Sequence, residues 1–359
     1  MSTCVVYIAS SITGSGGVSR IMSEKVKAFK EKGITVCIVS TNDTTETCFY
    51  TDLHQAELVF YPHKVNHVGA IALYYKFVQT EVINKLNPSV VLVIDNGIKG
   101  YFAPYYLTKK VPVFFECHGS RNFLKLQTNN WFKQQLILGS TAVLSFLFKG
   151  IVILNSQSKK DWWGRSTRVI PNFITLANFQ LPTSPVLHKK IVAISRIAPE
   201  KNIETLLQVW EKIYTMHPTW ELVICGGGDT AYFQMLQSKS IGVVWHGEVH
   251  DVSCFIEKAD FLLHCSVMEG MPMVFLEAMS CGKPVVAFDV DFGPADLIQE
   301  GSNGFLVPKN DVAYCVQKVN ELINNPSQII EMGIEARKSL VRFEKGRIVK
   351  QWLTFFESL

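Results

Sequence analysis

The sequence predicts an α/β protein built from two doubly wound domains, each with a parallel sheet covered by helices. Three observations carry this prediction. Short β-branched runs alternate with longer helix-like segments, the pattern of parallel strands joined by crossover helices. The chain has 359 residues, too many for one hydrophobic core and suited to two domains. A stretch containing Pro and Ser, residues 181–187, interrupts the alternation half-way.

The first half contains the elements of one such domain, expected at residues 1–175. Short β-branched runs predict strands at 4–9, 35–40, 58–61, 90–95, 111–116 and 151–154. Longer helical patterns predict helices at 17–32 and 67–86.

The second half repeats the alternation, and its domain is expected at residues 188–340, with the joint near 175–188. Strands are predicted at 190–194, 221–225, 243–245, 261–264, 284–288 and 305–307, with helices between them. Ligands of such sheets bind outside the carboxyl ends of the strands, so the expected site is a central cleft that the two domains face.

Composition excludes disorder, because 48% of the residues are hydrophobic and only 18% are charged. The formal net charge is +4, but residues 1–180 carry 19 Lys and Arg against 10 Asp and Glu. This asymmetry favours an anionic surface or ligand for the first half. The basic residues are scattered and form no clustered arm for nucleic acid, so an anionic membrane surface is the expected partner.

The nine cysteines show no CxxC or other zinc spacing, and several lie in apolar strand-like runs. We therefore expect buried free thiols. The first residues, MSTCVVYIASSITGSGG, lack a basic region and a cleavage site, which predicts a cytoplasmic protein.

The longest uncharged apolar stretch, residues 134–148, is shorter than the ~20 residues that a membrane-spanning helix needs. The surrounding segment, 121–149, mixes aromatic residues such as Trp131 with basic residues such as Lys125 and Lys133. It is expected either to lie on a membrane surface or to form a buried helix.

A glycine-rich loop, SSITGSGGVSR at residues 10–20, follows the first strand and opens a helix. Free backbone amides and the helix dipole make Gly16 and Gly17 a place for anions. Gly14 and Gly16 also begin a dinucleotide-type G-x-G-x-x-G, but Ser19 occupies the last position. A βα turn without a ligand is the alternative.

Two motifs follow strands of the second domain. In SRIAPEKN, residues 195–202, Arg196 and Lys201 are placed to clamp a diphosphate, or else are solvated surface cations. The strand 221–225 ends in Gly226, the first of three glycines, which either let a ligand approach the backbone or form a tight turn.

The most specific stretch is HCSVMEGMPMVFLEAMSCGKPVV, residues 264–286. Glu269 and Glu277 flank the start of its apolar helix. Carboxylates at these positions suit sugar and ribose hydroxyls, while the free amides of the helix suit phosphate. An unpartnered Glu on an apolar helix is costly to bury, which favours a functional role for Glu277.

Together these motifs resemble the retaining nucleotide-sugar glycosyltransferases of family four, of the bacterial surface-polysaccharide type, which have the GT-B fold of two Rossmann-like domains. The resemblance covers the whole second domain, including GSNGFLVP at residues 301–308. In the first domain it is sparser: the Gly16-Gly17 loop, ECHG at 116–119, NSQS at 155–158 and VIPN at 169–172. It also implies that residues 341–359 form a helix that crosses back to the first domain.

The resemblance implies a role for each site residue. Arg196 and Lys201 hold the donor diphosphate, Glu269 contacts the donor sugar, and Glu277 contacts the ribose. His118 faces the transferred sugar, and it is implied as catalytic together with Arg196, Lys201 and Glu269. The remaining implied donor-binding residues are Gly16, Gly17, Gly226, Gly270, Met271, Pro272 and Met273.

The implied reaction moves a hexose or N-acetylhexosamine from a nucleotide sugar, expected to be a UDP-sugar, to a saccharide acceptor, expected to be lipid-linked. The protein is then expected on the inner face of the cytoplasmic membrane, without a cofactor. No metal is expected, because the cations and helix amides stabilise the leaving diphosphate. The one Asp-x-Asp, Asp289 to Asp291, follows a strand in a region that is not a metal site in this family.

Three alternatives stay open. A phosphorylase or transferase acting on a soluble sugar belongs to the same family. A non-catalytic sugar-nucleotide binding module needs the same motifs. An NAD-dependent dehydrogenase draws on Gly14, Gly16 and Asp43, and leaves the motifs of the second domain without a role.

Overall fold

The computed structural model describes residues 3–43, 47–65, 67–128, 130–176, 187–237 and 241–359. Contacts divide the chain into two compact units. Unit 1 consists of Met1–Asn172 and Lys345–Leu359, and unit 2 of Phe173–Glu344. Most of the expected joint, residues 177–186, lies outside the described residues.

Unit 1 contains a seven-stranded sheet in the order β3-β2-β1-β4-β5-β6-β7, with every neighbouring pair parallel. In the centre, Val6 lies opposite Cys37 on one side and Val91 on the other. The strands are β1 (Cys4–Ala9), β2 (Thr35–Ser40), β3 (Glu57–Phe60), β4 (Val90–Val93), β5 (Val113–Cys117), β6 (Gly150–Ile153) and β7 (Thr167–Val169). Six of them match predicted strands, whereas β7 was missed because Arg168 interrupts its short β-branched run.

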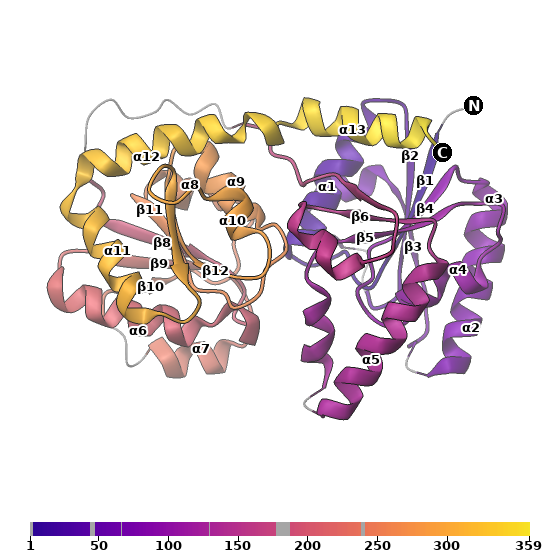
Figure 1. Cartoon of the computed structure of the whole chain (residues 1–359), viewed down its shortest axis with the longest axis horizontal. Helices are drawn as coiled ribbons and strands as arrows, with labels where there is room; N and C mark the ends of the chain where they lie inside the picture. The colour runs from indigo at the N-terminus through magenta and orange to yellow at the C-terminus, as the bar shows by residue number, and fades with distance from the viewer. Residues whose placement is uncertain (1–2, 44–46, 66, 129, 177–186, 238–240) are drawn as a thin grey trace. The chain divides into compact units, whose positions relative to one another are not determined.

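Helices lie on both faces of this sheet (Figure 1). The α-helices are α1 (Gly17–Lys30), α2 (Val68–Phe77), α3 (Asn84–Leu86), α4 (Ala103–Tyr106), α5 (Trp131–Leu144) and α13 (Lys345–Glu357). The single helix expected at 67–86 is interrupted by a π-helical turn at Val78–Ile83.

The C-terminal helix α13 packs on unit 1 through aromatic side chains. The ring of Trp352 lies 6.1 Å from that of Phe29 in α1, and the ring of Phe355 lies 4.9 Å from that of Phe114 in β5. Trp352 is fully buried. The last element of the chain therefore completes the core of the first unit.

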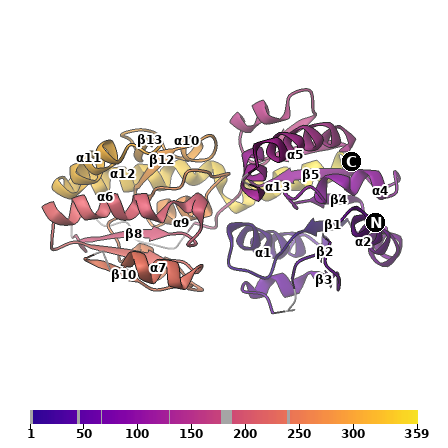
Figure 2. The same cartoon turned by 90° about the horizontal axis from the view of Figure 1, so that it is seen from below.

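Unit 2 contains a six-stranded parallel sheet in the order β10-β9-β8-β11-β12-β13. Its strands are β8 (Lys190–Ile194), β9 (Glu221–Cys225), β10 (Val243–Trp245), β11 (Phe261–His264), β12 (Val285–Asp289) and β13 (Gly304–Pro308). Helices again lie on both faces, as Figure 2 shows for both units. They are α6 (Ile203–Met216), α7 (Thr230–Gln237), α8 (Ser253–Glu257), α9 (Met273–Ser280), α10 (Pro294–Leu297), α11 (Val312–Asn324) and α12 (Pro326–Ser339).

Two expectations about burial need correction. Seven cysteines are buried, but Cys254 is exposed and Cys4 is half-buried, so these two are not core thiols. The helix α5 is not a buried helix, because Phe132 and Leu136 are largely exposed. Within the described ranges, every helix is too short or too polar to cross a bilayer.

Candidate functional site

In unit 2, the loops after β8 and β11 bring three polar residues together. Lys201 and Glu269 were predicted site residues, and His264 was not. The Lys201 ammonium lies 2.6 Å from Oε1 of Glu269. His264, the last residue of β11, places Nε2 2.7 Å from the same oxygen. Lys201 ends a short 3-10 turn at Pro199–Lys201, after which Asn202 adopts a left-handed conformation at φ 53°. This turn directs the chain back toward β11.

Two hydrogen bonds hold the same two loops together. The side-chain amide of Asn202 donates from Nδ2 to the carbonyl of Cys265 at 3.2 Å, and the backbone amide of Val267 donates to the carbonyl of Glu200 at 2.9 Å. These bonds fix the position of the Lys201 and Glu269 side chains relative to each other.

Glu269 is buried but remains ionised at neutral pH. Burial by itself would raise the pKa of the carboxyl group, but the nearby Lys201 ammonium and the contact with His264 outweigh it and lower the pKa to about 2. A buried carboxylate with two polar partners on one oxygen is suited to accept hydrogen bonds from ligand hydroxyls on the other.

Arg196 is separate from this group. Its guanidinium lies 3.1 Å from the carboxylate of Glu200, and 57% of its side chain is exposed. The two cations that the sequence placed five residues apart are therefore each paired with a different carboxylate. Arg196 is the more accessible of the two, since Lys201 is 18% exposed.

The glycines after β9 are required by the chain itself. A Cβ on Gly226, which has φ 154°, would lie 1.9 Å from the backbone oxygen of Ser195. A Cβ on Gly228, at φ 141°, would lie 2.6 Å from the oxygen of Ile197. The close approach at Gly226 is thus made by the loop after β8, and neither a ligand nor a simple tight turn is needed to explain it.

The start of α9 lies next to this group. Pro272 is the N-cap of α9, Met273 is its first residue, and both are buried, as are Gly270 and Met271. A Cβ on Gly293 would lie 2.4 Å from the oxygen of Gly270, so that loop is packed against its neighbour. Glu277 lies on the second turn of α9 and is half-buried.

In unit 1, His118 follows β5 and belongs to a chain of buried charges. Its Nε2 lies 2.8 Å from Oε1 of Glu116, and the Lys25 ammonium forms a buried ion pair with the same oxygen. Burial would raise the pKa of Glu116, but Lys25 and His118 lower it to about 2. Lys25 also lies 4.2 Å from the centre of the Trp352 ring in α13.

Lys25 was not among the predicted site residues, and Glu116 was given no role. A signal was present, because Lys25 follows Ile21 and precedes Phe29 at four-residue spacing. It therefore lies on the apolar side of α1, where a lysine needs a buried partner.

The glycine loop after β1 leads into α1, with Gly16 as the N-cap. Gly16 and Gly17 have no atom within 4 Å of an added Cβ, and neither has a positive φ. The chain's own packing therefore does not demand glycine at these positions.

Asp43 holds the beginning of that loop. Its carboxylate accepts hydrogen bonds from the Ser11 and Thr13 hydroxyls at 2.6 Å and from the Ile12 amide at 2.8 Å. Burial opposes ionisation, but these bonds and one from Ser40 lower the pKa of Asp43. Asp43 thus has a structural role, and the NAD-dependent dehydrogenase interpretation, which drew on Asp43, loses that support.

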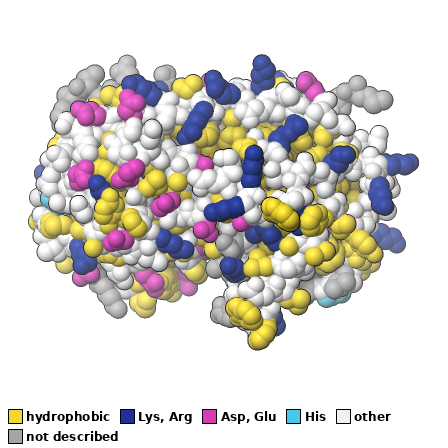
Figure 3. Space-filling model, viewed as in Figure 1, with side chains coloured by type: hydrophobic (Ala, Val, Ile, Leu, Met, Phe, Trp, Pro, Cys, Tyr) yellow, Lys and Arg dark blue, Asp and Glu magenta, His cyan; other side chains and the backbone are white. Residues whose placement is uncertain are grey.

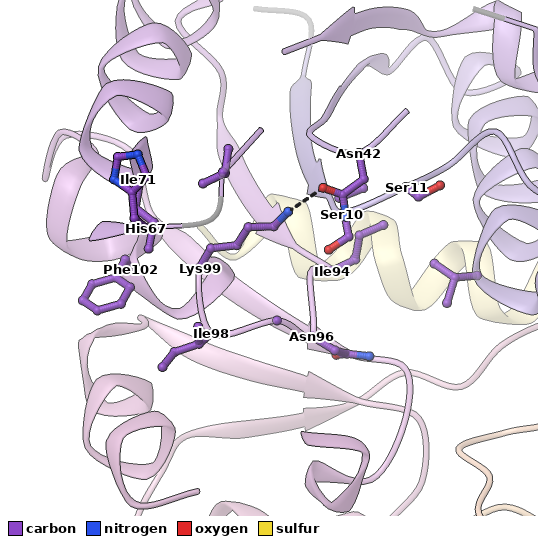
Figure 4. A pocket seen from close by; sticks show the side chains of 14 residues that line it. Ser10, Ser11, Asn42, His67, Ile71, Ile94, Asn96, Ile98, Lys99 and Phe102 are labelled. Carbon is purple, nitrogen blue, oxygen red and sulfur yellow. Dashed lines mark hydrogen bonds between the residues drawn. The ribbon is translucent and has the colours of Figure 1, made fainter. Parts of the chain in front are cut away.

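A pocket of about 750 Å³ lies in unit 1 where β1 and β4 end (Figure 4). Strand order reverses between these two strands, and such switch points are the usual ligand sites of doubly wound sheets. Lys99 extends across the pocket and donates to Oδ1 of Asn42 at 3.1 Å. Ile71, Ile94, Ile98 and Phe102 supply apolar walls, and Ser10, Ser11, Asn42, Asn96, His67 and Lys99 supply polar groups.

The Asp-x-Asp pair is exposed at both Asp289 and Asp291. Among the residues that the structure describes, His, Cys, Asp and Glu side chains form no group of three or more suited to holding a metal ion.

Comparison with known proteins points to a family of enzymes. Residues 179–339 match the family model described as Glycosyl transferases group 1. An uncharacterized glycosyltransferase of Haemophilus influenzae is 24% identical over 96% of this chain and 98% of its own length. The second half of the chain is therefore similar to the group 1 glycosyl transferases.

Two further similarities cover most of this chain. The lipopolysaccharide 1,6-galactosyltransferase of Escherichia coli is 25% identical over 89% of each chain. A crystal structure of Staphylococcus aureus TarM in complex with UDP superposes with a TM-score of 0.80, at 16% identity, over 99% of this chain and 100% of that one. The predicted GT-B fold, two Rossmann-like domains with parallel sheets, is confirmed.

Proposed function

We propose that this protein is a glycosyl transferase that moves a hexose or N-acetylhexosamine, with retention of configuration, from a UDP-sugar to a saccharide acceptor of bacterial surface polysaccharide synthesis. The observation that carries the proposal is the contact between Lys201 and Glu269 within the segment that matches the family. A sugar nucleotide presents a sugar directly bonded to a diphosphate. Glu269, which can bind sugar hydroxyls, lies 2.6 Å from Lys201, which can bind phosphate, so the two groups are adjacent just as the sugar and the diphosphate are adjacent in the donor.

In this proposal unit 2 holds the donor. Lys201 and the exposed Arg196 bind the diphosphate, Glu269 binds the sugar, and Glu277 binds the ribose. Backbone groups of Gly270, Met271, Pro272 and Met273 support the donor at the start of α9, and Gly226 shapes the loop beneath it. For unit 1, the resemblance assigns Gly16 and Gly17 to the phosphates and His118 to the transferred sugar, and these assignments stay predictions.

The chemistry required of these residues is mainly electrostatic. Breaking the bond between sugar and phosphate develops positive charge on the anomeric carbon and negative charge on the leaving diphosphate. Arg196 and Lys201 stabilise that negative charge without a metal ion. The acceptor hydroxyl oxygen bonds to the anomeric carbon on the face that the diphosphate leaves, and the departing phosphate accepts the proton of that hydroxyl. Because the new bond forms on the same face as the broken one, the configuration is retained.

The pocket of unit 1 is the proposed acceptor site. Sugar rings combine apolar faces with hydroxyl edges, and the pocket combines apolar walls such as Phe102 and Ile98 with the polar groups of Asn42, Asn96 and Lys99. We propose a lipid-linked saccharide as the acceptor, on the inner face of the cytoplasmic membrane. The E. coli relative, named a lipopolysaccharide 1,6-galactosyltransferase, supports this choice.

A thermal-shift screen of nucleotide sugars tests the donor, because a ligand that binds only the folded state raises the unfolding temperature. We expect stabilisation by one UDP-sugar, followed by slow release of UDP from it, and both should persist with a chelator present. Stabilisation by NAD and by no nucleotide sugar would overturn the proposal. Binding without any UDP release or transfer would favour the non-catalytic module.

A further inference from the structure

Helix α5 and the turn that follows it carry hydrophobic side chains on the side that faces solvent. Trp131, Phe132 and Leu136 are 61%, 77% and 72% exposed, and Val143 and Phe146 are similarly exposed. Figure 3 shows hydrophobic side chains gathered at the lower right of the view, where Figure 1 places α5. Trp163 is also largely exposed, and Gly164 beside it approaches the ring of Phe146. The six exposed hydrophobic residues are called the α5 face: Trp131, Phe132, Leu136, Val143, Phe146 and Trp163.

The exposed hydrophobic residues in the body of α5 lie on one side of the helix. At 100° per residue, Phe132, Leu136 and Val143 fall within a narrow sector, and Thr141, which is buried, lies on the opposite side. A helix on the surface of a soluble domain normally has the reverse arrangement, with polar residues outward. The outward side of α5 is therefore unusually apolar.

Two arginines fix the helix in this orientation. The Arg121 guanidinium donates to the carbonyl of Leu138 at 2.8 Å, and that of Arg165 donates to the carbonyl of Ala142. Arg165 also lies 3.4 Å from the centre of the Phe146 ring. Both arginines thus tie the backbone of α5 to unit 1, while Phe132, Leu136 and Val143 remain exposed.

The segment that contains this apolar surface is also positively charged. Between Glu116 and Asp161 the sequence contains six Lys and Arg and no acidic residue. Lys133 and Lys149, near the two ends of α5, are exposed, as are Lys159 and Lys160. An apolar surface with exposed lysines near its ends is complementary to an apolar layer that carries anionic groups on its surface.

We propose that the α5 face docks unit 1 on an anionic lipid bilayer, with α5 lying in the plane of the membrane interface. Tryptophan side chains such as Trp131 and Trp163 favour that interface, and lysine tails reach the headgroups while their stems lie in the apolar layer. Lysine is depleted at protein–protein interfaces, which argues against a second copy of this chain as the occupant.

This inference depends on the α5 face and not on the assigned donor or acceptor. If the acceptor is lipid-linked, docking brings the enzyme to the surface that contains it. Lipid binding is measured without any sugar, so a failure of docking and a failure of the proposed activity are distinguishable.

The test is flotation of the full chain with two kinds of vesicle, phosphatidylcholine alone and phosphatidylcholine containing phosphatidylglycerol. We expect binding to the anionic vesicles that decreases with added salt, and much weaker binding to the neutral ones. The tryptophan emission should shift to shorter wavelength on binding, and the double substitution Trp131→Phe and Trp163→Phe should remove that shift.

Substitutions separate the two contributions to binding. The double substitution Phe132→Ser and Leu136→Ser should abolish flotation, while Leu73→Ser, at a residue of α2 that is 62% exposed, is the matched control and should leave it unchanged. Lys133→Gln and Lys149→Gln should each weaken binding about five-fold, which corresponds to ~1 kcal/mol per cation near the membrane.

All variants should keep the parent's unfolding temperature, because the substituted side chains are exposed. Absence of flotation of the parent at low salt would overturn the proposal. So would lipid-independent dimerisation that Phe132→Ser and Leu136→Ser abolish, since the face would then join two copies. Equal binding to neutral and anionic vesicles would show that the lysines have no role and would also contradict it.

Discussion

Glu269 is a single residue with two partners, and each partner has a different consequence for the site. Lys201 neutralises the buried carboxylate, and His264 orients it from β11. Arg196, by contrast, pairs with Glu200 near solvent, where an ion pair contributes only about 0–1 kcal/mol to stability. Loss of Arg196 therefore affects the reaction with little effect on the fold, whereas loss of Lys201 affects both.

We predict that Arg196→Ala lowers turnover by at least ~10²-fold at an unchanged unfolding temperature, because its charge acts mainly on the leaving group. Lys201→Ala should lower turnover similarly and should also lower the unfolding temperature, since it leaves Glu269 without its ammonium partner. Steady-state kinetics and thermal unfolding measure both effects. Lys212→Ala on the exposed side of α6 is the control, and parent-like turnover in Arg196→Ala would contradict the assignment.

The two carboxylates of the donor motif are predicted to differ in their effects. Glu277→Gln should weaken the binding of free UDP, because Glu277 is assigned to the ribose. Glu269→Gln should leave UDP binding nearly unchanged and reduce transfer, because Glu269 is assigned to the sugar. Calorimetric titration with UDP and initial-rate measurements separate them. Equal UDP affinity in the parent and in Glu277→Gln would remove the ribose role.

The buried pair of Lys25 and Glu116 is expected to stabilise unit 1 only while both members are present. Glu116→Gln should cost about 3–5 kcal/mol in the free energy of unfolding, because it leaves Lys25 buried without a counter-charge. Adding Lys25→Met should recover part of that loss. Urea unfolding measures both variants, with Lys30→Met on the exposed side of α1 as the control. If the double variant were less stable than Glu116→Gln, the pairing argument would fail.

Among the elements of unit 1, α13 lies far from the others in sequence and yet contributes to their core. Trp352 packs its ring against Phe29 and against the ammonium of Lys25. The element is needed because α1 and the sheet would otherwise expose these groups to water. Removal of this ring therefore tests how strongly the end of the chain stabilises its beginning.

We predict that Trp352→Ala lowers the free energy of unfolding of unit 1 by about 3–5 kcal/mol, the usual cost of emptying a fully buried aromatic site. Gln351→Ala, at the exposed neighbouring position, should have almost no effect. Urea unfolding followed by circular dichroism compares the two variants. Equal stability of Trp352→Ala and the parent would show that α13 contributes little to the core.

At the scale of the whole molecule, the described part of each unit contains a buried carboxylate whose pKa is lowered to about 2. Glu116 in unit 1 and Glu269 in unit 2 are both lowered from an ordinary value of 4.5 to about 2. The unfolded chain binds these protons at higher pH than the folded chain does. The stabilisation is thus complete above about pH 4.5 and is lost as the pH falls toward 2.

We therefore predict that both units lose stability together in acid. The free energy of unfolding in urea should be lower at about pH 3 than at about pH 7. This free energy should change less steeply with pH in Glu269→Gln, because that variant has one fewer group that takes up a proton. Unfolding of Glu277→Gln, where the carboxylate is half-buried, is the comparison. A parent stability independent of pH across this range would contradict the lowered pKa values.

The position of nearly every strand was predictable from sequence, because burial on both faces of a parallel sheet demands continuous β-branched runs, a local property. The strands of unit 2, β8 to β11 among them, match their predicted ranges. The edge strand β7 was not predictable, since the exposed Arg168 lies between Thr167 and Val169 and leaves no such run. The motif around Glu269, residues 264–286, could also be found from local sequence, because its residues follow a strand whose end was predicted.

Local sequence patterns are therefore sufficient to predict which segments are strands and helices, and which residues lie at the carboxyl ends of strands. The tertiary structure was needed to learn which groups meet: Lys25 with Glu116, 91 residues apart, or Lys201 with Glu269, 68 residues apart. It also decided that Gly226 is packed against the chain and that the apolar side of α5 faces outward. The reason is physical. A local pattern fixes whether a residue is buried, but strand order and the placement of helices, which depend on the whole core, fix what lies beside it.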